Sequence, residues 1–384
     1  MSKFKYFRFL FLTTLLWGGL AYGHSVISST SKPTFKFHGG ATLWYYRPQQ
    51  SWVDENFSIY DVYADTDVTY KNYGAHIDMR FRDNKFRGYY PSNFWFQQAY
   101  GFYRQPNYII KIGKEYTHFG KFWDGSYYGN VLYFDGIVLN PDDGISWEGK
   151  LPHLRGWQMH YYLQYFVVDG TTNGSLDPWG QNGEGGLDGQ ETGDGAPIVS
   201  SLQTGRDTVS IPGSHRRNEV IARVEPIFLL PHNCKLKLGL NYEHLLSDIT
   251  DVNDSSVVPE RIHMHRYAAD LTFVHNNWSI FFEWAHQDGL TALDFPLFNQ
   301  PSRHIDYYWA GTRYKFGKFT VYYNYSDGFY HDENIHDITQ VPGIGYQVNK
   351  YISSSFEYGY WYRIDAGSFS TNDNSLNFIL TANI

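Results

Sequence analysis

The chain of 384 residues combines a net negative charge with many aromatic side chains. Acidic residues outnumber basic ones by 39 to 31, and Phe, Trp and Tyr make up 19% of the sequence. This charge excludes nucleic acid as a partner, because binding it needs a basic face. Cys234 is the single cysteine, so no disulfide framework holds the fold together. The mean hydropathy of -0.46 excludes a bundle of membrane helices.

The first 23 residues have the features of an export signal. Three basic residues precede an apolar core at 9–22, and Ala21 and Gly23 are the small residues that a signal peptidase reads. We expect cleavage before His24, with residues 24–384 forming a single domain. An N-terminal anchor is the alternative, but the apolar core falls short of the roughly 20 residues that a spanning helix needs.

Alternating side chains predict β-strands in several parts of the chain. Between Tyr73 and Arg82 the odd positions are apolar and the even ones are mostly polar or charged, and the same pattern recurs at 235–243 and 356–363. These runs approach ten residues, the length of a tilted membrane-spanning strand, whereas strands of a soluble sandwich average about five or six. A secreted soluble β-protein with an aromatic core is the alternative interpretation.

Short turns and long polar segments alternate along the chain. The sequence predicts short turns at 71–72, 105–107, 150–156, 231–233, 276–277, 317–318 and 349–350. It predicts longer loops at 47–56, 84–93, 116–143, 169–215, 247–261, 288–303, 327–342 and 365–374. Strict alternation requires 131–140 to belong to a loop. It then gives about sixteen antiparallel strands in an up-and-down transmembrane β-barrel, an all-β fold.

The final strand provides the closing edge of this barrel. From Leu376 to Ile384 every even position is apolar, so one face of the strand suits lipid. Closure against residues 34–46 would leave no unpaired backbone in hydrocarbon. A barrel of this size encloses water, which makes it a channel.

The chain resembles the Gram-negative outer-membrane porin superfamily in the general or substrate-selective, 16-stranded form. The resemblance covers nearly all of residues 24–384, and the segment from Lys111 to Gly120 followed by Phe134-Asp135-Gly136 is similar to the strand and third loop of porins. It implies a bacterial outer-membrane location, a passive pore for small hydrophilic solutes or ions, contact with membrane lipid and assembly as a homotrimer. It implies neither enzymatic activity nor a cofactor. The C-terminal Ile384 departs from the Phe with which porins commonly end.

The resemblance also implies a long third loop that folds into the lumen and forms a constriction. Loop carboxylates would then face basic residues on the wall, and the resulting field would set ion preference. The loop candidates are Lys121, Asp124, Asp135, Asp142 and Asp143. The wall candidates are Lys36, Arg80, Arg82, Lys111, Arg223 and Lys237.

Other chemistry has weaker support in the sequence. The Gly-rich segment 169–215 begins like a calcium loop, but Gly180 stands where the bidentate Glu belongs. His263 and His265 have ligand spacing without a nearby cysteine or carboxylate, so no metal site is predicted. The chain contains no Gly-x-Ser-x-Gly elbow. A barrel hydrolase, an adhesin or a purely structural barrel remain the alternatives to a porin.

Overall fold

The computed structural model describes sixteen β-strands joined into one closed sheet. It describes residues 32–48, 56–81, 94–121, 141–154, 156–168, 215–249, 260–288, 304–331, 334–365 and 368–383. The predicted signal peptide lies outside these residues. The strands are β1 (Thr34–Pro48), β2 (Asn56–Tyr70), β3 (Tyr73–Phe81), β4 (Phe94–Arg104), β5 (Tyr108–Tyr116), β6 (Pro141–Leu154), β7 (Trp157–Val168), β8 (His215–Leu230), β9 (Cys234–Ile249), β10 (Glu260–His275), β11 (Trp278–Asp288), β12 (His304–Phe316), β13 (Phe319–Tyr330), β14 (Ile335–Gln347), β15 (Ile352–Asp365) and β16 (Ser368–Asn383). Within the described ranges, no helix is long and apolar enough to cross a membrane.

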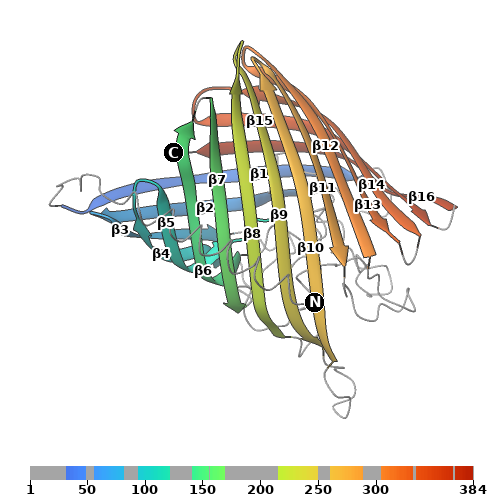
Figure 1. The fold of residues 1–384 in the computed structure, drawn as a ribbon. Coiled ribbons are helices and arrows are strands. Elements are labelled where there is room, and N and C mark those ends of the chain that lie inside the picture. The colour runs from blue at the N-terminus through green and yellow to red at the C-terminus, as the bar shows by residue number, and fades with distance from the viewer. Residues whose placement is uncertain are drawn as a thin grey trace.

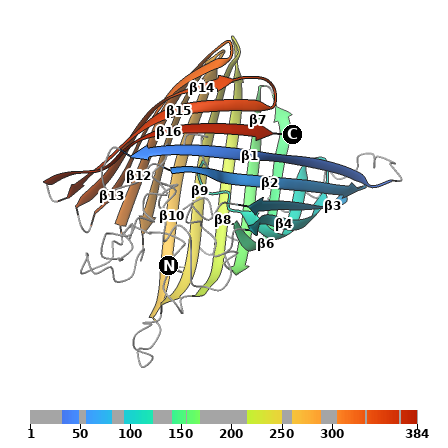
Figure 2. The ribbon, with the colours of Figure 1, turned by 180° about the vertical axis from the view of Figure 1, so that it is seen from behind.

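Every strand pairs in antiparallel fashion with its sequence neighbours, and β1 closes the barrel against β16. The closing ladder runs from Gly40 opposite Asn383 to Pro48 opposite Ser375. Figures 1 and 2 show the two strands side by side from opposite directions, with β1 in blue and β16 in red. The predicted closure of 34–46 against 375–384 is therefore confirmed. Strands on opposite walls cross at a large angle in Figure 1, as strand tilt in a barrel requires.

The two faces of the sheet have opposite chemistry. In β11 the side chain of Phe282 is 45% exposed, whereas its neighbour Glu283 is fully buried. The same alternation places Leu240 outside and Asn241 inside on β9. Among the described residues, buried polar and charged side chains outnumber buried apolar ones. This is the reverse of a soluble protein and fits a barrel with lipid outside and a polar interior.

Left-handed backbone conformations confirm several predicted short turns. Lys71, Asn276 and Gly317 have φ values of 53°, 51° and 58°, and each begins a connection of two residues. Asn233 has a φ of 57° in the turn between β8 and β9. Asn and Gly tolerate this conformation, which matches the twist of a hairpin. The end of the barrel that carries these turns is named the short-turn end below.

Three predicted connections are too long. β6 continues to Leu154, which pairs with Trp157, so the turn predicted at 150–156 shrinks to its last two residues. The predicted loops 327–342 and 365–374 consist mostly of paired strand, because β13 runs to Tyr330, β14 already begins at Ile335 and β16 begins at Ser368. Polar residues in these stretches hide the strand pattern, since a strand whose inner face is wet needs few apolar side chains.

A charge placed on the outer face tests which side contacts lipid. Leu240 is 58% exposed in the middle of β9, so Leu240→Arg should lower the free energy of unfolding in lipid vesicles by about 2–4 kcal/mol. Leu240→Met is the matched control and should change it little. Urea titration followed by Trp fluorescence measures both variants. Equal stability of the arginine and methionine variants would show that this face does not contact hydrocarbon.

Candidate functional site

The segment that follows β5 turns into the barrel interior. The backbone N–H of His118 donates to Gln164 on β7 at 2.6 Å, and that of Gly120 donates to Asn241 on β9 at 3.1 Å. The N–H of Lys121 reaches both carboxylate oxygens of Glu283 on β11, at 3.1 and 3.0 Å. Residues 117–121 therefore cross the interior from the wall at β5 and β7 toward the wall at β9 and β11. They are named the crossing segment below. Residues 122–140 of the predicted third loop lie outside the described residues, and its last residues, 141–143, belong to β6.

The crossing depends on a glycine at position 120. Gly120 has a φ of +68°, and a Cβ atom there would lie 2.0 Å from Oε1 of Glu283. Any other side chain would therefore meet both backbone strain and a buried carboxylate. The absence of a side chain lets the backbone approach Glu283, which then accepts from the N–H of Lys121.

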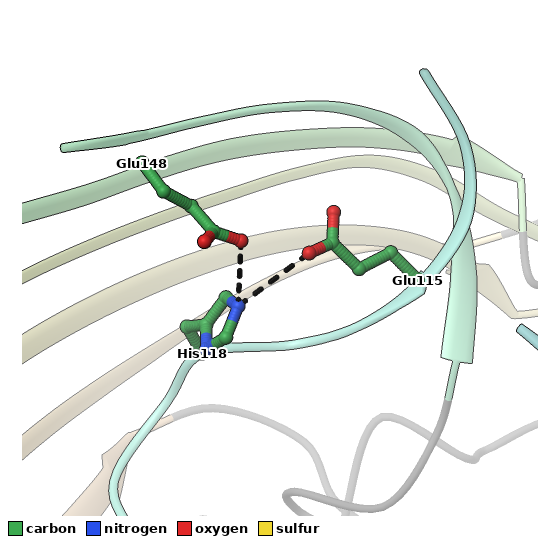
Figure 3. A group of neighbouring side chains, drawn as sticks. All are labelled: Glu115, His118 and Glu148. Carbon is green, nitrogen blue, oxygen red and sulfur yellow. Dashed lines mark hydrogen bonds and ion pairs between the residues drawn. The ribbon is translucent and has the colours of Figure 1, made fainter. Parts of the chain in front are cut away.

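The first charged cluster of the interior links β5, β6 and the beginning of the crossing segment. Nε2 of His118 lies 3.0 Å from Oε1 of Glu148 and 3.5 Å from Oε1 of Glu115 (Figure 3). Nζ of Lys111 contacts the same two carboxylate oxygens, and the hydroxyl of Ser146 donates to Glu115. Burial favours a neutral His118 ring, but its hydrogen bonds to the two carboxylates outweigh burial and raise its pKa.

The second charged cluster connects β8 to β10 across β9. Arg223 donates to both oxygens of Asp270, at 2.6 and 3.2 Å, and to Oε2 of Glu225 at 3.0 Å. Nζ of Lys237 lies 3.6 Å from Oε1 of the same Glu225. A Cβ atom at Gly239 would lie 1.9 Å from the Asp270 carboxylate, so the glycine on the middle strand leaves room for the pair. Only a bidentate, fully hydrogen-bonded pair offsets the cost of burying both charges.

Two aromatic rings lie beside the cation at the end of the crossing segment. Nζ of Lys121 lies 4.7 Å from the ring centre of Phe281 and 5.8 Å from that of Trp309, and those two rings are stacked at an interplanar angle of 5°. The Lys121 ammonium also contacts the hydroxyl of Thr272. Burial lowers the pKa of Lys121, and the carboxylates of Asp270 and Glu283 oppose this only in part.

These clusters form a charged lining that holds side chains of both signs. Each carboxylate in the two charged clusters contacts a cation or a hydrogen-bond donor. Fixed charges of both signs inside a narrow, low-dielectric passage create a transverse field that orients dipolar solutes. In the described part of the crossing segment the sign is opposite to the expected one, because His118 and Lys121 face wall carboxylates.

The structure assigns places to most of the residues proposed from the sequence. Lys111, Arg223 and Lys237 lie on the inner face within the clusters above, and Lys121 lies on the crossing segment. Arg80 is also on the inner face, where it makes two contacts of 2.7 Å with Asp78. Lys36 alternates with the exposed Phe35 and Phe37 near the short-turn end of β1 and is itself exposed.

The remaining candidates separate into two groups. Asp142 and Asp143 were expected on the third loop, but both belong to β6, opposite Glu115 and Lys114 of β5. Their short polar side chains conceal, in the sequence, the start of a strand that begins at Pro141. Arg82, Asp124 and Asp135 lie outside the described residues, so their proposed roles stay predictions.

Sequence reasoning missed the carboxylates of the wall and the histidine of the crossing segment. Glu115 and Glu148 belong to the first cluster, Asp270 binds Arg223, and Glu283 binds the backbone of Lys121. None of these four carboxylates was predicted from the sequence. The sequence could have indicated two of these residues, Glu115 and Glu148. Glu115 lies four residues after Lys111 on the same strand, so both side chains point to the inner face. Glu148 alternates in the same way with Trp147 and Gly149. The pattern of one strand does not show which side chain of a neighbouring strand it will contact.

Comparisons with known proteins place the fold. No family model and no curated protein matches the chain. The outer membrane channel DcaP of Acinetobacter baumannii is 12% identical over 94% of this chain and 100% of its own, with a TM-score of 0.57. The anion-selective porin from Comamonas acidovorans is 7% identical over 92% and 100%, also with a TM-score of 0.57.

A third solved structure is similar to this chain to about the same degree. The trimer form of OmpT, an outer membrane protein of Vibrio cholerae, is 11% identical over 92% of this chain and all of its own, with a TM-score of 0.55. The chain has the fold of the outer-membrane porins. At these identities the likeness describes the architecture, which fits an outer-membrane location.

The buried pair of Arg223 and Asp270 is a test of the inner lining. Arg223→Met leaves Asp270, whose side chain is 1% exposed, without its bidentate partner and should lower the free energy of unfolding by about 3–5 kcal/mol. Adding Asp270→Asn removes the stranded charge and should restore most of that loss. Lys315→Met, on an exposed position, is the control and should stay within about 0.5 kcal/mol. An undiminished loss in the double variant would contradict the pairing.

Proposed function

We propose that the chain is an outer-membrane porin through which small hydrophilic solutes and ions diffuse without an energy source or cofactor. The observation that carries the proposal is the polar and charged inner face of a closed sixteen-stranded barrel, crossed by residues 117–121. A barrel of this strand number encloses a lumen wider than its own side chains fill. Two structures of similar fold, an outer membrane channel and an anion-selective porin, support the same function.

The narrow zone of the proposed pore lies where the crossing segment meets the wall. Phe119 is 1% exposed there, and Lys121 lies between Glu283, Thr272 and the ring of Phe281. Cations and carboxylates in this zone favour dipolar, hydrophilic solutes over apolar ones. Side chains of both signs line it, so selectivity depends on which charges remain accessible to the passing ion.

A barrel hydrolase is the competing function, and the Glu115–His118–Glu148 cluster is the feature that favours it. A serine hydrolase needs its nucleophile within hydrogen-bond reach of the base. In this cluster the hydroxyl of Ser146 donates to Glu115, and His118 contacts the two carboxylates. Lys111 further neutralises both carboxylates. The arrangement therefore fits a structural charge network better than a nucleophile and base, and we propose a non-enzymatic protein.

The proposal includes export, an outer-membrane location and assembly. Residues 1–23 would direct export and be removed before His24, which N-terminal sequencing of membrane-extracted protein measures. One structural relative is described in a trimer form. A homotrimer of this chain, packed through the apolar outer faces of some strands, is part of the same proposal and follows from that likeness alone.

Conductance in a planar bilayer tests the proposed function. The refolded chain should give discrete open steps of constant size when it inserts, because a water-filled lumen of fixed width passes ions at a fixed rate. Addition of heat-denatured protein is the control and should give no steps. A silent bilayer, with insertion verified by protease protection, would favour the hydrolase or adhesin functions instead.

Ion preference tests whether the inner cations influence the pore. The side chain of Lys237 is 34% exposed on the inner face. Lys237→Glu should move the reversal potential toward cation preference, with roughly a two- to fourfold change in the local concentration of each ion for a charge change of two at about 10 Å in dilute salt.

Lys350→Glu provides the matched control for the selectivity measurement. Lys350 is exposed in the turn between β14 and β15, outside the paired wall. The same change of charge at this position should leave the reversal potential nearly unchanged. Equal shifts in the two variants would mean that the overall charge of the protein, and not the lining, sets the preference.

A further inference from the structure

We propose that Glu115, His118 and Glu148 form a binding site for a divalent transition metal ion such as Zn²⁺, for which the ammonium group of Lys111 competes. Three ligand atoms, one from each residue, all lie within 4.8 Å of one another. Figure 3 shows both carboxylates directed at the same ring nitrogen of His118. The site lies on the barrel interior, where β5 continues into the crossing segment.

The spacing of the ligand atoms matches a small tetrahedral ion. Nε2 of His118 is 3.0 Å from Oε1 of Glu148 and 3.5 Å from Oε1 of Glu115. Zinc bonds of about 2.1 Å in a tetrahedron separate the ligand atoms by about 3.4 Å. An ion placed between the three atoms therefore needs small movements of the two flexible Glu side chains and withdrawal of the Lys111 ammonium, which contacts the same two oxygens.

The donor set selects among metals. One imidazole nitrogen and two carboxylate oxygens suit borderline ions such as Zn²⁺. Ca²⁺ takes six to eight oxygen ligands, and Mg²⁺ demands a near-ideal octahedron with several waters. A three-residue site that contains a histidine therefore favours the transition metal over both.

Neighbouring groups hold the ligands in place. The hydroxyl of Ser146 donates to the other carboxylate oxygen of Glu115. The ring of His118 lies against Tyr162 with centroids 4.6 Å apart, and its backbone N–H is fixed by Gln164. Such outer contacts orient metal ligands and cost about 10–100-fold in affinity when they are removed.

An ion has a route to these residues. The His118 side chain is 33% exposed, and Glu148 lines an open cavity of about 270 Å³ between the β4–β5 turn and β7. Tyr162 and His160 also line this cavity. Glu148 is the one proposed ligand that lines this cavity, so an ion would reach the site from the side of Glu148.

Lys111 sets the affinity of the site. Its Nζ contacts Oε1 of both Glu115 and Glu148, the same atoms that would bind the ion. The two carboxylates and the Lys111 ammonium together carry a net charge of -1. Without the ammonium the two carboxylates carry -2, which matches a divalent ion. Removal of the Lys111 charge should therefore tighten metal binding at least about tenfold.

Titration of Zn²⁺ into the refolded, detergent-solubilised barrel, followed by calorimetry, tests the site. The wild-type chain should bind one equivalent that His118→Ala weakens by at least about 100-fold, since a direct ligand matters more than an outer one. Ser146→Ala should weaken it about 10–100-fold, and Lys111→Met should tighten it. Co²⁺ in place of Zn²⁺ should give a visible absorption band that His118→Ala abolishes.

His160→Ala is the matched control, because His160 lines the same cavity but lies 3.9 Å from Glu225 and outside the cluster. It should bind Zn²⁺ like the wild type. Equal Zn²⁺ affinity in His118→Ala and the wild type would overturn the proposal, as would equal losses in the His118 and His160 variants. The binding measurement requires no conduction, so a barrel that is silent in bilayers yet binds Zn²⁺ through His118 would reject the porin and retain the metal site.

Discussion

Closure of the sheet is the constraint on which the rest of this structure depends. An open sheet leaves a row of unpaired N–H and C=O groups at each edge, and hydrocarbon offers them no partner. Here the ladder between β1 and β16 pairs the first described strand with the last, 300 residues and more away in sequence. Once the sheet is closed, every strand has one face outside and one inside, and this division assigns a role to each side chain.

The interior then follows from electrostatics. Charges that face inward must be paired, because an isolated buried charge is costly. The wall meets this requirement through contacts between strands, as in the Arg223–Asp270 pair, and through contacts with the segment that crosses inside. Glu283 is fully buried, and both of its carboxylate oxygens accept from the single backbone N–H of Lys121. The crossing segment is thus held by the same carboxylates that would give a pore its field.

One cluster combines structural support with a further chemical capacity. Lys111, Glu115, His118 and Glu148 join β5, β6 and the crossing segment, so they stabilise the point at which the chain leaves the wall. Two carboxylates and an imidazole around one position are also metal ligands. A lysine that contacts the carboxylates supplies the charge of a cation without an ion. The same residues can therefore serve the barrel and hold an exchangeable metal.

The sequence by itself determined the β-barrel, its strand number, most turns and the closing pair, because a period of two and the turn residues are local properties. It also placed Lys111, Arg223 and Lys237 on the inner face by parity. It misjudged both ends of β6, the end of β13 and the beginnings of β14 and β16, where polar inner faces conceal the strands. Only the tertiary structure decided which carboxylates those cations meet and where residues 117–121 cross. Contacts such as Gly120 with Asn241 join positions more than a hundred residues apart, and no local pattern encodes which strands become neighbours across a lumen.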